Sequence, residues 1–202
     1  HKYRPWRNYL KGLWDGRRDG LQLLVTGSAR LEYYRFGGDS LQGRHHLLRM
    51  HPFSAAELGL NTSKELESLL VLGGFPEPFL SASETQARRW SREYRTLLLR
   101  EEIDSLEQVS DLGTLERLML ALPERVGSPL SLNALREDLQ VSHKTVARWV
   151  ELLERLYAIV LVPPFGHAKL RAVKKERKHY HWDWTLVEEP GARFENLVAM
   201  HL

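Results

Sequence analysis

The sequence predicts an α/β segment, followed by a mainly α region with a winged helix-turn-helix and by the start of a further α/β domain. Three observations lead to this fold class. A continuous apolar run at residues 21–25 is typical of a strand buried in a parallel sheet. Helical periodicity dominates from Lys64 onward. Within residues 113–178, two helices joined by a short turn precede a strand and a basic segment.

Composition indicates a globular protein with a substantial core. The 202 residues are 43% hydrophobic and include six tryptophans. The absence of cysteine excludes disulfides, thiolate zinc sites and cysteine nucleophiles, and it fits a reducing compartment, so we expect a cytoplasmic location. No apolar run approaches the ~20 residues of a membrane helix, so we expect no membrane partner.

Residues 1–60 read as the last part of an α/β sheet. Apolar spacing predicts a helix over residues 6–14, and the strand at 21–25 runs into Thr26-Gly27-Ser28. A second strand is predicted at 46–50, and a short helix at 52–58. Ligands of open α/β sheets bind at the carboxyl ends of strands, where Ser28 stands.

Residues 61–112 are predicted to form a helical lid or linker. A helix over 64–72 is followed by a break at Gly73-Gly74-Phe75-Pro76 and by a long helix from Glu84 to about residue 106. The long helix carries four arginines that we interpret as a solvated face: Arg88, Arg89, Arg92 and Arg95.

Residues 113–178 are predicted to form the winged helix. Helices are expected at about 115–126, from the N-cap Ser131 through Leu139, and at 142–156, with a strand at 159–162. Three polar side chains point outward from the second helix of the helix-turn-helix: His143, Lys144 and Arg148.

The basic segment that would form the wing adds Lys174 and Lys175, which can meet phosphates. DNA is therefore one predicted partner. A solvated hairpin tip explains the same lysines, and winged helices also serve as lids or docking modules, so other protein subunits are the alternative partner.

Residues 179–202 are predicted to begin a further domain that the chain does not complete. Strand alternation places His179, His181 and Asp183 on one face, but a His-x-His pair on an edge strand is usually a surface feature, so no metal site is predicted. Exposed tryptophans at 182 and 184 would suit a protein-interaction adaptor, which is a third possible function.

Several strings in this order resemble the predicted AAA+ ATPases of prokaryotes that carry a C-terminal domain of unknown function. The strings are Leu24-Val25-Thr26-Gly27-Ser28-Ala29, Leu41-Gln42-Gly43-Arg44, Pro52-Phe53-Ser54-Ala55-Ala56-Glu57, Gly73-Gly74-Phe75-Pro76-Glu77 and Phe194-Glu195-Asn196-Leu197-Val198-Ala199. The resemblance implies a parent protein that hydrolyses ATP with Mg²⁺, with a helical and winged-helix region and a nuclease-like C-terminal fold. Asp183 and Glu195 would fall on the first strand and helix of that fold, without a complete site, so no nuclease activity is predicted.

The chain departs from this family in lacking G-x-x-x-x-G-K-[ST], which cradles the β-phosphate, and the Asp-Glu pair of Walker B. We expect it to begin just after Walker B, to be inactive alone and to bind no nucleotide tightly. By resemblance, Ser28 matches the sensor position and Arg44 the arginine finger. The alternatives are that residues 26–28 cap a helix and that Arg44 is a surface arginine.

Overall fold

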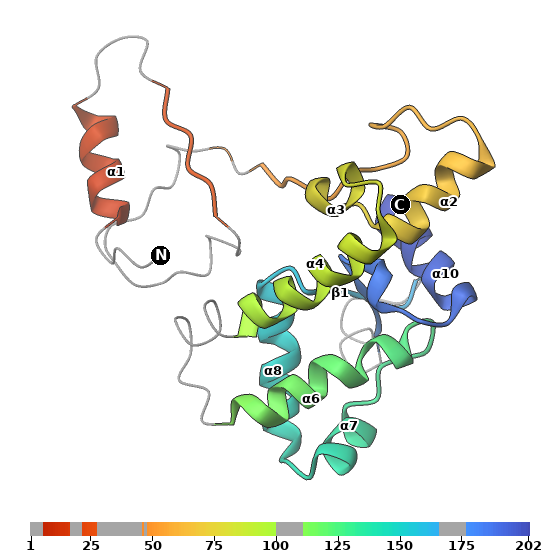
Figure 1. Ribbon diagram of the computed structural model, residues 1–202. Helices are drawn as coiled ribbons and strands as arrows, with labels where there is room; N and C mark the ends of the chain where they lie inside the picture. The colour runs from red at the N-terminus through yellow and green to blue at the C-terminus, as the bar shows by residue number, and fades with distance from the viewer. Residues whose placement is uncertain (1–5, 17–21, 28–45, 47, 100–110, 166–176) are drawn as a thin grey trace. The chain divides into compact units, whose positions relative to one another are not determined.

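The computed structural model of the chain (Figure 1) describes residues 6–16, 22–27, 46, 48–99, 111–165 and 177–202. These residues fall into two compact units, His1–Met50 and His51–Leu202, which we describe separately. The boundaries proposed above at residues 60, 112 and 178 remain predictions.

In the first unit, the predicted N-terminal helix is confirmed as α1, Trp6–Asp15. The two predicted strands are wrong for the residues described. Residues 22–27 have no regular structure and are exposed, and Leu24 and Met50 are 87% and 98% accessible. An apolar run becomes a buried strand only when neighbouring strands satisfy its backbone, and no described residue of this unit pairs with either segment.

The second unit begins with a turn where a short helix was predicted. Ser54 donates to the Glu57 carboxylate through its amide at 2.9 Å and its hydroxyl at 2.8 Å. Backbone bonds from Leu58 to Ser54 and from Leu60 to Ala55 close the turn. These local bonds, and the positive φ of Gly59 (63°), replace a continued helical ladder.

The helices of the lid region follow their capping signals. Helix α2, Ser63–Leu72, starts with a capping box in which Thr62 and Glu65 bond each other's backbone amides. It stops at Gly73, whose φ of 82° ends the helix. A short helix α3, Pro76–Leu80, and the long helix α4, Glu84–Leu97, follow. The predicted continuation of α4 to residue 106 falls mostly outside the described residues.

The next helices are also confirmed. Helix α6, Leu112–Ala121, ends earlier than predicted and passes into the 3-10 turn η3, Pro123–Arg125, because Pro123 has no amide to continue the ladder. Helix α7, Leu132–Leu139, and helix α8, His143–Arg155, begin at their N-caps Ser131 and Ser142. Five residues of α8 and its end are buried as the periodicity predicts: Val146, Trp149, Val150, Leu153 and Leu156.

Two antiparallel strands complete a small sheet. Strand β1, Ile159–Val162, pairs with β2, Lys178–His181, in a register that joins Ile159 to His181. An isolated bridge links Pro129 to Lys178 on the other edge of β2. The region is thus mainly helical with a two-stranded sheet.

The chain ends with the turn η4, Trp184–Leu186, and helix α10, Pro190–His201. Helix α10 contacts β2, η4 and α2, as Figure 1 shows in blue and orange. The C-terminal residues therefore pack within the second unit. Over the described ranges, no helix has the length and apolar character needed to cross a membrane.

Candidate functional site

Three of the five strings that carried the family resemblance, at residues 52–57, 73–77 and 194–199, meet in space around Gly74 and Trp184. The amide of Phe53 donates to the Gly74 carbonyl at 2.6 Å, and the Trp184 indole donates to the Leu69 carbonyl at 3.1 Å. A Cβ on Gly74 would lie 2.6 Å from the Trp184 ring and 2.9 Å from the Phe53 carbonyl oxygen. Only glycine fits at this position without displacing its neighbours.

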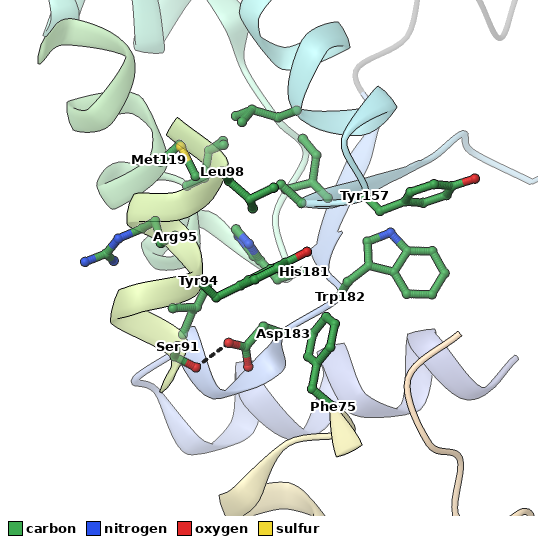
Figure 2. A pocket seen from close by; sticks show the side chains of 15 residues that line it. Phe75, Ser91, Tyr94, Arg95, Leu98, Met119, Tyr157, His181, Trp182 and Asp183 are labelled. Carbon is green, nitrogen blue, oxygen red and sulfur yellow. Dashed lines mark hydrogen bonds between the residues drawn. The ribbon is translucent and has the colours of Figure 1, made fainter. Parts of the chain in front are cut away.

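Asp183 forms the polar centre of this region. Its carboxylate accepts a hydrogen bond from the Ser91 hydroxyl (Figure 2). It also accepts from the amide and the hydroxyl of Thr185, at 3.1 and 2.6 Å. Burial raises the pKa of Asp183, and the hydrogen bonds from Ser91 and Thr185 partly oppose that rise. Ser91 therefore supplies a hydrogen bond to the buried carboxyl group of Asp183.

The two histidines of β2 are buried, so the expectation that this pair lies at the surface is wrong. His179 Nε2 lies 2.8 Å from the Leu122 carbonyl oxygen, while His181 Nε2 has no hydrogen-bond partner among the described residues. Burial lowers the pKa of His179, and lowers that of His181 to about 3 with a further contribution from His179. Both rings are therefore neutral at pH 7. Among the residues whose positions are described, no group of three or more acidic or histidine side chains could hold a metal ion.

Asn196 and Glu195, from the last family string, fix β2 from the side of α10. The Asn196 side chain bonds both the amide and the carbonyl of His181 at 2.8 Å. Glu195 accepts from Lys178 Nζ at 2.9 Å and from the Tyr180 hydroxyl at 2.8 Å. The pKa of Glu195 is lowered by Lys178 first and by Tyr180. Asp183 and Glu195 thus have different structural partners.

A small pocket opens beside this network, between α4, the end of α8 and the β2–η4 segment (Figure 2). Its wall is largely apolar, and His181 and Asp183 supply polar atoms to it. The aromatic lining residues are Phe75, Tyr94, Tyr157 and Trp182. Trp182 is half-buried, and Trp184 is only 1% exposed, so the predicted adaptor surface cannot include Trp184. Sequence patterns gave no sign of this pocket, because its residues come from five separate segments.

The predicted nucleic-acid contacts on α8 are all exposed. His143, Lys144 and Arg148 lie in the first two turns of the helix, and Lys144 and Arg148 share one face because they are four residues apart. Ser142 caps the helix by accepting from the Thr145 amide at 3.1 Å. The other predicted site residues, Ser28, Arg44, Lys174 and Lys175, lie outside the described residues.

Comparison with known families defines the class of the chain. Residues 1–59 match the family described as an AAA domain, so the N-terminal part is related to AAA-type ATPases. Residues 63–189, well over half of the chain, match a domain of unknown function, DUF8612, and the chain belongs to this family. No curated protein and no solved structure matches the chain.

Proposed function

We propose that this chain is part of an AAA-type ATPase whose parent binds ATP and Mg²⁺, and that the 202 residues alone do not hydrolyse ATP. The observation that carries the proposal is the AAA match over residues 1–59 in a sequence that contains no G-x-x-x-x-G-K-[ST] string. That loop supplies the backbone amides and the lysine that bind the β- and γ-phosphates. Without it, phosphate affinity is weak.

Ser28 as the sensor and Arg44 as the arginine finger belong to this proposal. A polar side chain at the first position orients water against the γ-phosphate, and an arginine at the second stabilises the charge of the transition state on a neighbouring subunit. Calorimetric titration of the chain with Mg²⁺ and ATP tests the proposal. We expect no saturable heat at micromolar protein, whereas a micromolar dissociation constant would contradict it.

A winged helix that binds duplex DNA is the second candidate function. The order α6, α7, α8, β1 and β2, with the bridge between Pro129 and Lys178, favours this architecture. The exposed His143, Lys144 and Arg148 at the start of α8 favour a phosphate-contacting surface.

Duplex binding over a salt series tests the second candidate. Contacts to phosphates release counterions, so the affinity should fall steeply as salt rises. No salt-dependent binding at low ionic strength would leave α8 as a lid or a protein-docking surface.

A further inference from the structure

The segment at residues 52–60, called the docking segment below, is fastened to the rest of the second unit by two long-range backbone donors. The Phe53 amide donates to the Gly74 carbonyl at 2.6 Å, and the Ala55 amide donates to His201 Nε2 at 3.0 Å. Three of its side chains pack against the buried cluster of Leu69, Trp184 and Leu197, namely Ala55, Leu58 and Leu60. Nearly the whole segment belongs to the AAA match, which ends at residue 59.

The contact with Ala55 fixes the protonation state of His201. A backbone amide can only donate, so Nε2 must hold a free lone pair. The ring proton is then on Nδ1, which lies 2.7 Å from the Leu197 carbonyl oxygen and donates to it. The neutral Nδ1–H tautomer is the only form of His201 that makes both hydrogen bonds.

Protonation of the ring would put a second N–H on Nε2, directed at the Ala55 amide. Two donors cannot bond each other, so the Ala55 contact would be lost while the Leu197 contact remains. We infer that His201 is a protonation-controlled clasp: when neutral it accepts a hydrogen bond from the Ala55 amide and ties this part of the docking segment to α10, and when charged it loses that hydrogen bond. The inference does not rest on the proposed ATPase relationship of the parent.

The surroundings of His201 are mostly apolar. The Trp184 ring lies 5.8 Å away, and α2 contributes Leu66, Leu69 and Leu70 to the same cluster. The ionisable groups on the docking-segment side are Glu57 and His51. Hydrogen bonds from Ser54 are the main cause of the lowered pKa of Glu57, with small contributions from His51 and His201. An ionised Glu57 attracts a charged His201, so this carboxylate favours the protonated ring, the form that has lost the Ala55 hydrogen bond.

Nuclear magnetic resonance of the full 202-residue chain tests the clasp. At pH 8, the ¹⁵N shifts of His201 should show the Nδ1–H tautomer. Between pH 8 and 5, the protection factor of the Ala55 amide should fall about fivefold, the value of one net hydrogen bond, with the same midpoint as the His201 ring. The Leu135 amide, bonded to the Ser131 carbonyl, should keep its protection.

Two variants sharpen the test. His201→Phe keeps a ring beside Trp184 but has no acceptor, so Ala55 should be weakly protected at every pH. His51→Gln keeps the clasp and should retain the pH-dependent step. The inference is overturned by an Nε2–H tautomer at pH 8, or by Ala55 protection that stays constant while His201 titrates. The tautomer decides the question even if His201→Phe does not fold.

Discussion

The side-chain amide of Asn196 hydrogen-bonds both backbone groups of His181, donating to the carbonyl and accepting from the amide at 2.8 Å each. Asn196 is fully buried, so no solvent replaces these bonds. The Asn196 side chain makes the hydrogen bonds that a further strand would make beside the end of β2. The contact joins α10 to the sheet across 15 positions of sequence.

Replacing Asn196 with alanine should destabilise the second unit by about 2–4 kcal/mol, because a buried donor and a buried acceptor both lose their partners. Urea unfolding followed by tryptophan fluorescence measures the change. Asn133→Ala, at an exposed position of α7, is the matched control and should shift the free energy of unfolding by less than about 0.5 kcal/mol. Equal effects of the two variants would show that the amide clamp does not stabilise the fold.

Gly74→Ala should cost about 1–3 kcal/mol, since the added Cβ would overlap the Trp184 ring and the Phe53 carbonyl. Gly113→Ala is the control. Its Cβ would have only an ordinary contact of 3.8 Å to Asp111, and alanine is the better helix former in α6. Thermal unfolding should therefore give a lower melting temperature for Gly74→Ala and a higher one for Gly113→Ala than for the unchanged chain. An unchanged melting temperature for Gly74→Ala would contradict the close packing of Gly74 against Phe53 and Trp184.

His181 should make the fold sensitive to acid. Its pKa in the folded chain is about 3, below the ~6.5 of an unfolded histidine, so acid protonates the unfolded chain preferentially. Its contribution to stability is complete above about pH 6.5 and is lost as the pH falls toward 3, by about 1.4 kcal/mol per pH unit. Asp183 acts in the opposite sense, because its raised pKa favours the fold when the carboxyl is protonated.

His181→Leu should remove this part of the acid sensitivity and leave the part due to His179. Free energies of unfolding at pH 7 and pH 4.5 test the change. The difference between the two values should be smaller in the variant, whereas His143→Gln, at the exposed start of α8, should keep the wild-type difference. An unchanged difference in His181→Leu would mean that this ring is not held neutral in the fold.

If α8 binds duplex DNA, the double variant Lys144→Ala/Arg148→Ala should weaken binding and lower the slope of log K against log salt by about 2. The fold should remain intact, because both side chains are exposed. Lys64→Ala/Arg92→Ala removes the same charge from exposed positions on α2 and α4 and should leave the slope unchanged. Equal losses of DNA affinity in both double variants would indicate a general effect of net charge and would contradict a specific contact by α8.

Local signals predicted much of the helical region. Ser131 caps α7 as predicted, and the apolar spacing of α8 matches its buried face. The strand predicted from the apolar run at 21–25 is wrong for the residues described, because burial depends on neighbouring segments that a local pattern does not reveal. The burial of Trp184 and His179 depends on partners 115 and 57 positions away, so it could not be predicted from their alternation.

Steady-state ATP turnover tests the central claim most directly. The 202-residue chain is incubated with ATP and Mg²⁺, and phosphate release is compared with a blank that contains no protein. We predict no turnover above the blank, because the sequence lacks the loop that holds the β-phosphate. Phosphate release clearly above the blank, in proportion to the concentration of the chain, would contradict the account.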